Sequence, residues 1–508
     1  MYSQLKTCVL NGIEGYIVNV ETDLQNGMPI FNIVGLPDIS IKESKERVRA
    51  AIKNSSYEFP LQRITVNLAP ANLRKEGSQM DLPIAIGILK AGNVIFEDID
   101  EDTAILGELS LDGEIYGING ILPMVISLRD LGVKKIVIPF DNRFEAAPVK
   151  DVEIIPVKSL SDLVRYLNKE LEIKNTDGLV EEGGEVHYDV DFSDIKGQVA
   201  LKRGMEVAAA GGHNLLMIGP PGSGKTMAAM RLPTILPDLT FEESIEVTKI
   251  YSITGELKKS GLVKERPFRA PHHTASAVSL IGGGRIPKPG EVSLAHNGVL
   301  FLDELPEFSR NVLEVLRQPM EDRLVNITRA NASLTFLSNF MLVASMNPCP
   351  CGYLGDPTHE CTCSQNSISA YLNKISSPLL DRIDLHMEVS QVKFKEIDSL
   401  EKGESSSVIR ERVRKAREIQ TERFKDTKIF SNAMMNGNQI SKYCPLSNSS
   451  KKLLEAAFDR YGFSARTHGK ILKIARTVAD LKGSENIGDE DLLEAIRYRT
   501  INKKYWER

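Results

Sequence analysis

Residues 215–226 read LLMIGPPGSGKT, and this stretch decides the core of the fold. Its first four residues are a continuous apolar run, typical of a strand buried on both faces of a parallel sheet. The other eight match G-x-x-x-x-G-K-T, the phosphate-binding loop that joins such a strand to a helix, here expected to run to about Leu236. A glycine turn that matches by chance is the alternative, and the strand-to-helix context disfavours it. The stretch therefore predicts an α/β core that binds a nucleoside triphosphate.

The residue types in this loop suit a triphosphate carried with magnesium. The glycines let successive backbone N–H groups face the phosphates, Lys225 reaches the terminal phosphates, and the Thr226 hydroxyl ligates Mg²⁺. We therefore expect ATP contacts along the whole loop: Gly219, Pro220, Pro221, Gly222, Ser223, Gly224, Lys225 and Thr226.

Two further apolar runs deliver polar side chains at their ends. Residues 299–302 lead into Asp303 and Glu304, and residues 340–344 lead towards Asn347. We expect Asp303 to hold magnesium through water, Glu304 to polarise the attacking water and Asn347 to orient that water. A lone acidic pair is also common in a solvated turn, but beside a phosphate loop the pair favours ATP hydrolysis.

Composition divides the chain near residue 180. Residues 176–194 carry seven acidic side chains, three glycines and no lysine or arginine, which suits a solvated connector. Before it, β-like runs such as 63–68 and 135–139 alternate with helical patterns, and after about residue 405 the periodicity is helical throughout. The predicted organisation is a mixed α/β domain at 1–170, an acidic linker at 171–192, the nucleotide-binding core with a basic insert and a cysteine-rich loop at 193–395, and a helical domain at 396–508.

The totals limit the class of protein. At 508 residues the chain is too long for one hydrophobic core. It has no basic segment followed by an apolar stretch at its start and no run of about 18 apolar residues, so we predict a cytoplasmic protein without membrane contact. Six cysteines in so long a chain fit a reducing compartment, and a net charge of −5 confines any nucleic-acid contact to a local patch.

One region has the charge expected for such a patch. Residues 251–290 contain seven lysines or arginines against two glutamates, and the segment 282–290 resembles a flexible loop rich in glycine and proline. A second candidate is the hairpin predicted over 322–340. Repeated around a ring, such loops would attract a phosphate backbone, whereas incidental charge on solvated loops is the alternative. His272 and His273 are expected to be structural rather than metal ligands. The predicted DNA contacts are Arg285, Lys288, Arg323 and Arg329.

Four cysteines are crowded just after Asn347. Cys349 and Cys351 form one C-x-C pair, and Cys361 and Cys363 form another after nine intervening residues. Four thiolates closed by a short loop can hold zinc tetrahedrally, although C-x-C is less usual than C-x₂-C. If one thiolate does not bind, His359 is a substitute ligand. The alternative is four free cysteines in a surface loop. Zinc here would pin the loop and would not be catalytic.

Two arginines follow the core in an order that suits charge stabilisation in phosphoryl transfer. Arg382 lies in SPLLDRID at 377–384 and Arg466 lies in FSAR at 463–466. On residue type alone, an ordinary surface ion pair explains either arginine better.

The sequence closely resembles the magnesium-chelatase-like AAA+ proteins of the ComM/YifB family over essentially the whole chain. The matching stretches, in order, are GLPD at 35–38, RITVNLAPAN at 63–72, GELSLDG at 107–113, the phosphate loop, RPFRAPHHT at 266–274, PGEVSLAHNGVLFLDELPE at 289–307, NPCPCG at 347–352 and LLDRIDLH at 379–386. The resemblance implies an AAA+ core, in which helices flank a parallel sheet, with a C-terminal helical lid and a hexameric ring. It also implies that Arg382 is the arginine finger on the neighbour's ATP and that Arg466 is the lid sensor.

The same resemblance implies a function on DNA. It points to an ATP-dependent helicase that drives branch migration while single strands integrate during natural transformation and homologous recombination. The implied partners are single-stranded and branched DNA and recombination proteins. A magnesium-chelatase-type subunit, or another AAA+ remodelling chaperone, is the alternative. Against the chelatase, the chain has no D-x-S-x-S adhesion motif.

The first domain resembles the proteolytic domain of Lon, an α/β domain that uses a serine and lysine dyad. The Lon pattern laid on KEGSQMD at 75–81 puts Gln79 at the nucleophile, and the downstream pattern laid on GINGIL puts Leu122 at the lysine. A shift of one residue would supply the Ser78 hydroxyl but no lysine. We therefore expect no peptidase activity.

Overall fold

The structure is a computed structural model and describes residues 1–73, 75–179, 188–257, 261–284, 287–329, 332–357, 359–392, 403–427 and 429–506. The chain forms two compact units. The first comprises Met1–Glu185 and Phe241–Val263, and the second comprises Val186–Thr240 and Lys264–Arg508. The chain therefore passes between the units three times, whereas the sequence predicted one acidic connector. Residues 180–187 of that connector lie outside the described part.

A seven-stranded sheet is the framework of the first unit, with the strand order β3-β4-β2-β1-β5-β8-β9. The strands and their bounds are β1 (Tyr2–Asn11), β2 (Glu14–Gln25), β3 (Ile30–Val34), β4 (Arg63–Ala69), β5 (Thr103–Ile105), β8 (Lys135–Pro139) and β9 (Glu153–Val157). Side chains alternate between the two faces, so Ile64, Val66 and Leu68 of β4 are buried while the residues between them are partly exposed. The strands predicted over 63–68 and 135–139 are confirmed.

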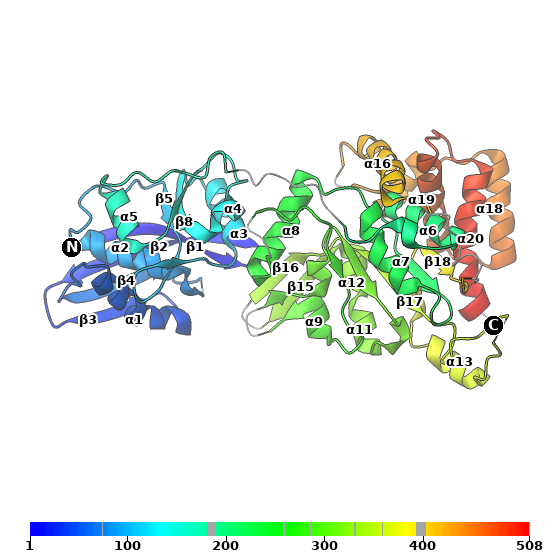
Figure 1. The fold of residues 1–508 in the computed structure, drawn as a ribbon, viewed down its shortest axis with the longest axis horizontal. Helices are drawn as coiled ribbons and strands as arrows, with labels where there is room; N and C mark the ends of the chain where they lie inside the picture. The colour runs from blue at the N-terminus through cyan, green and yellow to red at the C-terminus, as the bar shows by residue number, and fades with distance from the viewer. Residues whose placement is uncertain are drawn as a thin grey trace. The chain divides into compact units, whose positions relative to one another are not determined.

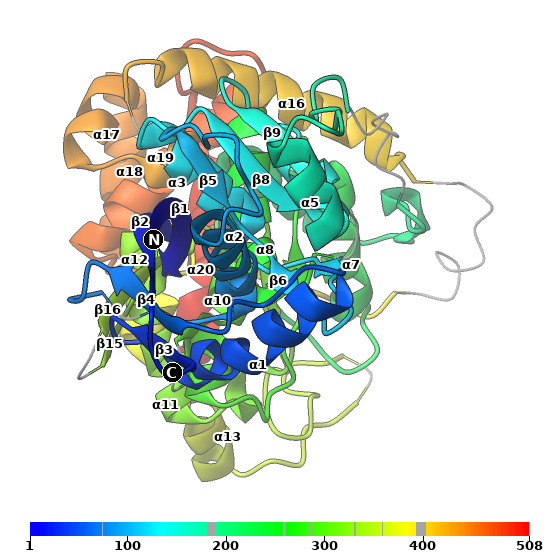
Figure 2. The same cartoon turned by 90° about the vertical axis from the view of Figure 1, so that its left-hand side faces the viewer.

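Helices cover this sheet: α1 (Ile39–Asn54), α2 (Asp81–Ala91), α3 (Ile121–Asp130), α4 (Arg143–Ala146), α5 (Leu160–Leu167) and α8 (Phe241–Thr254). A small two-stranded sheet is formed by β6 (Glu108–Leu109) and β7 (Ile115–Tyr116). Figures 1 and 2 both show α2 beside β1 and β2, which it contacts. Nearly every residue of α2 is buried, because the helix is apolar on all sides. The N-cap Asp38 begins α1 by accepting a 2.8 Å hydrogen bond from the Ile41 backbone.

The helix α8 comes from the range predicted for the nucleotide-binding core but folds into the first unit. Its Ser252 donates a 2.5 Å hydrogen bond to Glu145, and the Leu122 backbone N–H donates to the same carboxylate at 3.0 Å. The Gly120 N–H donates to the Ser252 carbonyl at 3.1 Å. Burial raises the pKa of Glu145. The inserted helix is thus fixed at the N-terminal end of α3.

A parallel five-stranded sheet is the framework of the second unit, in the order β11-β14-β17-β10-β18. Its strands are β10 (Leu215–Ile218), β11 (Phe268–Arg269), β14 (Val299–Leu302), β17 (Met341–Met346) and β18 (Leu385–Glu388). Leu215 pairs with Val343 on one side and Leu385 on the other, so β10 lies between β17 and β18. The predicted apolar runs are strands, although β17 begins at Met341 rather than Phe340.

Helices and two hairpins surround this sheet. The helices are α6 (Val199–Gly211), α7 (Lys225–Arg231), α9 (Ala277–Ile281), α10 (Glu291–Leu294), α11 (Arg310–Val315), α12 (Arg317–Asp322), α13 (Gln365–Leu372) and α14 (Ser377–Leu380). The hairpins are β12 (Gly282–Gly283) with β13 (Lys288–Pro289) and β15 (Leu324–Arg329) with β16 (Ala332–Leu337). The helix after the phosphate loop was expected to reach Leu236. It is α-helical only to Arg231 and continues as a 3-10 turn, since Pro233 lacks the N–H that an α-helix requires.

The chain ends in the predicted helical region: α16 (Ser406–Arg423), α17 (Gly437–Tyr443), α18 (Asn448–Tyr461), α19 (Ala465–Leu481) and α20 (Asp489–Trp506). These helices, orange to red in Figure 1, lie together, and α16 and α19 both contact α6. Among the described residues, no helix is long and apolar enough to span a membrane.

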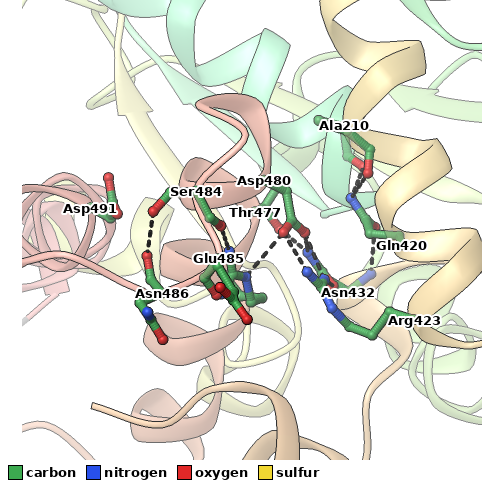
Figure 3. A network of polar contacts seen from close by, with 12 residues as sticks. Ala210, Gln420, Arg423, Asn432, Thr477, Asp480, Ser484, Glu485, Asn486 and Asp491 are labelled. Carbon is green, nitrogen blue, oxygen red and sulfur yellow. Dashed lines mark hydrogen bonds and ion pairs between the residues drawn. The ribbon is translucent and has the colours of Figure 1, made fainter. Parts of the chain in front are cut away.

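A buried polar network holds this helical region together and attaches it to α6 (Figure 3). The fully buried Asp480 carboxylate accepts from Arg423 at 2.6 Å and from Asn432 at 2.7 Å. Gln420 accepts from the Asn432 backbone at 2.9 Å and donates to the Ala210 carbonyl at the end of α6 at 3.0 Å. The network therefore fixes the helical region to the element that precedes β10.

Candidate nucleotide site

Three adjacent strands of the second sheet end at the same edge with polar side chains. β10 leads into the phosphate loop, β14 into Asp303 and Glu304, and β17 into Asn347. Ligands of open parallel sheets bind at the carboxyl ends of the strands, because the loops there converge. The fold thus brings together the residues that the sequence predicted for ATP.

The phosphate loop has the conformation that its glycines allow. Gly222 and Gly224 have φ values of 72° and 88°, in the left-handed region that favours glycine. A Cβ on Gly219 would lie 2.2 Å from the Val389 carbonyl oxygen, so only glycine fits there.

The Lys225 ammonium group lies inside the curve of this loop. It donates to the carbonyls of Gly219 at 2.7 Å and Pro220 at 2.8 Å, and it lies 3.3 Å from the Asn347 side-chain oxygen. Burial lowers the pKa of Lys225 to about 8, although the nearby carboxylates Asp303 and Glu304 partly oppose this shift.

The two predicted magnesium residues are in direct contact. Thr226 Oγ1 donates to Asp303 Oδ2 at 2.7 Å. Ser345 in β17 donates to the other oxygen of the same carboxylate. Ser345 was not predicted, although one signal was available, since it is a polar residue inside a fully buried apolar strand. The Asp303 carboxylate is therefore fixed by Thr226 of α7 and by Ser345 of β17.

Glu304 differs from Asp303 in its backbone conformation and in the contacts of its side chain. Its backbone has φ 54° in the left-handed region, which is uncommon for a residue other than glycine, and its N–H donates to Asp303 Oδ1 at 3.0 Å. Its side chain is 57% exposed, and the nearest cation candidate is His273 Nδ1 at 3.7 Å from Oε2. The geometry leaves the carboxylate open to water.

His273 was predicted to be structural. It stacks on His272 with ring centroids 4.1 Å apart and meets Phe308 edge-on at 6.4 Å. The His272 ring accepts from the Thr274 backbone at 3.4 Å. Neither histidine belongs to a metal-ligand cluster among the described residues. The His273 contact with Glu304 adds a neighbour of the nucleotide site that no motif identified.

The two predicted arginines occupy different environments. The Arg382 side chain is 13% exposed, and its guanidinium lies 2.5 Å from Glu321 of α12 and donates to the Pro378 carbonyl at 2.7 Å. Arg466 is the second residue of α19 and is exposed, with no hydrogen bond or ion pair to the described part of the chain. The structure thus does not bring either arginine into contact with the phosphate loop residues described above.

The four cysteines form one compact cluster. The sulfur atoms of Cys349, Cys351 and Cys361 are 3.4 to 3.6 Å apart, and all four Sγ atoms lie within 4.8 Å of one another. The Cys351 backbone N–H also donates to Cys363 Sγ at 3.3 Å. His359, the substitute ligand, is not part of the cluster.

His359 makes other contacts. Its ring stacks on Tyr353 at 4.8 Å, and its Nδ1 lies 3.7 Å from Asp356. The described geometry therefore offers a metal four sulfur atoms and no imidazole.

The predicted DNA contacts differ in accessibility. Lys288 is exposed at the start of β13, and Arg285 lies outside the described residues. Arg329 ends β15, and its side chain is also outside the described part. Burial lowers the pKa of Arg323 to about 10, and one of its guanidinium nitrogens is buried. Lys288 is thus exposed, whereas Arg323 is partly buried.

The positions of the absent Lon dyad are also described. Gln79 is buried and donates to the Glu76 carbonyl at 2.8 Å, and Leu122 is fully buried at the start of α3. Ser78 donates to Glu108. Lys75 of the same segment is buried and donates to the Pro70 carbonyl, and burial lowers its pKa.

Three family descriptions match the chain. Residues 191–397 match "Magnesium chelatase, subunit ChlI", residues 20–142 match "Subunit ChlI of Mg-chelatase", and residues 403–499 match the C-terminal part of subunit ChlI. The first of these covers the nucleotide site and the cysteine cluster, and the last covers most of the helical region.

Individual relatives match over the whole length. Competence protein ComM of Haemophilus influenzae is 44% identical over 96% of both chains. YifB of Escherichia coli is 40% identical over 97% of this chain and 96% of its own. Lon protease 2 of Bacillus subtilis is 29% identical over 124 residues, which is 24% of this chain and 22% of its own.

Proposed function

The chain belongs to the magnesium-chelatase-like AAA+ family that includes ComM and YifB, and on this premise we propose that it is an ATP-driven DNA motor. The observation that carries the ATPase part is the convergence of Lys225, Thr226, Asp303 and Asn347 at one edge of a parallel sheet. The DNA part is supported by the similarity to a competence protein and by the local basic segment.

In this proposal each site residue has its own role in ATP hydrolysis. Lys225 donates to the terminal phosphates, and Thr226 and Asp303 hold Mg²⁺, which neutralises charge that develops on the phosphates. Glu304, whose side chain is 57% exposed, polarises the attacking water. Asn347, next to Lys225, orients that water against the terminal phosphate.

A ring completes the site. We propose a homo-hexamer in which Arg382 acts on the ATP of the adjacent copy and Arg466 acts as the lid sensor. Arg382 pairs with Glu321 rather than with the phosphate loop of its own chain, which supports action on a neighbour. An arginine that acts in trans is worth about 10³ to 10⁵ in turnover in related phosphoryl transfers.

The proposed DNA activity is branch migration by translocation, with single-stranded and branched DNA as substrates and recombination proteins as partners. In a hexamer, six copies of the hairpin that carries Arg285 and Lys288 would surround the central hole and bind the phosphate backbone electrostatically. We place this activity in the cytoplasm, where reducing conditions keep cysteines as thiols.

The cysteine cluster fits zinc. A Zn–S distance of about 2.3 Å gives tetrahedral sulfur edges of about 3.8 Å. The three closest Sγ separations, 3.4 to 3.6 Å, are near this value. We propose one structural zinc ion held by Cys349, Cys351, Cys361 and Cys363. Well under one zinc per chain in protein purified without added metal would contradict this.

One experiment separates the DNA motor from the chelatase subunit. ATP hydrolysis is measured without ligand, with single-stranded DNA, with a branched junction, and with a porphyrin and Mg²⁺. We expect stimulation by the two DNAs together with strand displacement on the junction. Stimulation by the porphyrin alone would favour the chelatase.

Two variants test the parts of this proposal separately. Glu304→Gln should bind ATP but lose turnover by about 10²- to 10⁴-fold. Lys288→Ala should leave the unstimulated ATPase unchanged and weaken DNA binding, with a smaller dependence on salt. Lys451→Ala, at an exposed position of α18, is the matched control for loss of one charge. Equal DNA affinity for both lysine variants would refute the hairpin contact.

A further inference from the structure

The loop that carries the cysteine cluster lies directly against the phosphate loop. A Cβ on Gly352 would lie 2.5 Å from Pro221 Cδ and 2.8 Å from its Cγ, so at this point the two loops are in close contact. Gly352 immediately follows Cys351, and its N–H donates to the Cys349 carbonyl at 3.0 Å. The contact with Pro221 is therefore made by the turn that the cluster holds.

The cluster is also connected to Asn347 from both of its ends. Upstream, only the buried Pro348 separates Cys349 from Asn347. Downstream, Cys363 leads into α13, where Tyr371 is buried with its hydroxyl close to the Asn347 backbone. Asn347 in turn contacts Lys225. Movement of the cysteine loop would thus reach the phosphate loop through Pro221 and the lysine through Asn347.

We propose that metal held by the four cysteines braces the phosphate loop, so that occupancy of the cluster sets the affinity of the site for nucleotide. The inference rests on the ATP site and on the zinc site proposed above, and it adds a functional link between them.

The physical reason is preorganisation. All six cysteines are free, so without metal no bond joins the two C-x-C pairs, and the segment between Cys351 and Cys361 is held by weaker contacts such as the stacking of Tyr353 on His359. A zinc ion cross-links it and removes conformational freedom that nucleotide binding must otherwise remove. Two observations explain why position 352 is a glycine: its φ is 88°, and the missing Cβ leaves room for Pro221.

The chain offers a matched pair of variants for the test. Gly352 and Gly355 lie in the same loop with φ values of 88° and 79°, but a Cβ at Gly355 would meet nothing within 4 Å. Gly352→Ala and Gly355→Ala therefore impose a similar backbone strain, and only the first presses on the phosphate loop. Cys363→Ser removes a ligand, and Cys444→Ser removes a buried cysteine outside the cluster.

The experiment measures zinc content and affinity for a fluorescent ATP analogue in the full chain, without DNA. We expect Cys363→Ser to lack zinc and to bind the analogue about tenfold more weakly or worse. Gly352→Ala should keep its zinc and show a similar loss of affinity. Gly355→Ala and Cys444→Ser should match the parent in both measurements. Removal of zinc from the parent with a chelator should weaken binding, and added Zn²⁺ should restore it, which separates the effect from misfolding.

Three results would overturn the inference. The first is a parent protein that contains no zinc. The second is a zinc-depleted parent whose affinity for the analogue is within about twofold of that of the zinc-loaded parent. The third is a Gly352→Ala variant that binds the analogue as tightly as Gly355→Ala. If the parent binds no nucleotide at all, the proposed function fails instead. Binding of nucleotide that does not depend on zinc leaves the ATPase intact and refutes only the link.

Discussion

Thr226 Oγ1 and Asp303 Oδ2 are joined by a 2.7 Å hydrogen bond between residues 77 positions apart in the sequence. The bond links the first turn of α7 to the end of β14. It places a hydroxyl and a carboxylate where an oxygen-seeking cation would be shared between them. Ser345 holds the second carboxylate oxygen, so the pair is positioned before any ligand binds.

The first prediction concerns this pair and Mg²⁺. Ser345→Ala leaves the carboxylate without its second partner and should raise the Mg²⁺ concentration for half-maximal ATPase by about 10- to 100-fold, as is usual for residues that support a metal ligand. Thr226→Ala should have a larger effect, whereas Thr226→Ser keeps the hydroxyl and should behave like the parent. A magnesium titration of turnover tests this, and an unchanged midpoint for both alanine variants would refute the assignment.

The second prediction concerns pH. Lys225 has a pKa lowered to about 8 by burial, with Asp303 and Glu304 as the charged groups that oppose the shift. The lysine is therefore charged below pH 8 and becomes neutral above it, so ATP affinity should fall between pH 7 and pH 9. Binding at pH 8 to 9 should take up protons, because phosphate restores the charged form.

Calorimetry in two buffers of different ionisation enthalpy measures this proton uptake. Lys225→Arg is the control, since a guanidinium does not titrate in this range. Proton uptake by the arginine variant equal to that of the parent would show that another group is responsible.

The third prediction tests the shared site. Glu304→Gln and Arg382→Ala should each be inactive alone, since one removes the water-polarising carboxylate and the other the neighbour's guanidinium. Mixed in equal amounts, they should regain activity, because about one quarter of interfaces would join an intact Glu304 to an intact Arg382. A control mixture of Glu304→Gln with Lys225→Ala should stay inactive, as both changes fall on the phosphate-loop side. No recovery in the first mixture would mean that Arg382 acts within its own chain.

The fourth prediction concerns the buried network of Figure 3. Asp480 is fully buried between Arg423 at 2.6 Å and Arg476 at 3.0 Å. Asp480→Ala leaves two guanidinium groups without their partner and should lower the free energy of unfolding of the second unit by about 3 to 5 kcal/mol. Arg414→Ala breaks only exposed pairs on α16 and should lower the free energy of unfolding far less. Urea unfolding followed by circular dichroism compares them.

The fifth prediction concerns the first unit. With Gln79 and Leu122 at the positions of the Lon dyad, ATP should not stimulate cleavage of an unfolded protein substrate. Time-dependent cleavage that Ser78→Ala abolishes would contradict this, since Ser78 is the nearest hydroxyl and donates to Glu108.

Local patterns in the sequence were sufficient for the core of the nucleotide site. The strand before the phosphate loop, the strand before Asp303 and the helical C-terminal region depend on apolar periodicity and on glycine, and short segments carry both signals. The cysteine cluster could be predicted from an equally short segment, because its four cysteines lie within one loop.

Other features depended on contacts between distant residues, which no local pattern records. The helix α8 follows the phosphate-loop helix in sequence but is fixed in the first unit by Ser252 and Glu145, 107 residues apart. Arg323 was predicted as a DNA contact from its charge, and tertiary packing partly buries it. The contact of Gly352 with Pro221, which connects the cysteine loop to the phosphate loop, exists only because parallel strands bring their carboxyl ends together. The sequence by itself thus determined which groups the candidate nucleotide site contains, because short motifs carry them, and the tertiary structure decided which of them touch, because contacts between distant residues depend on packing.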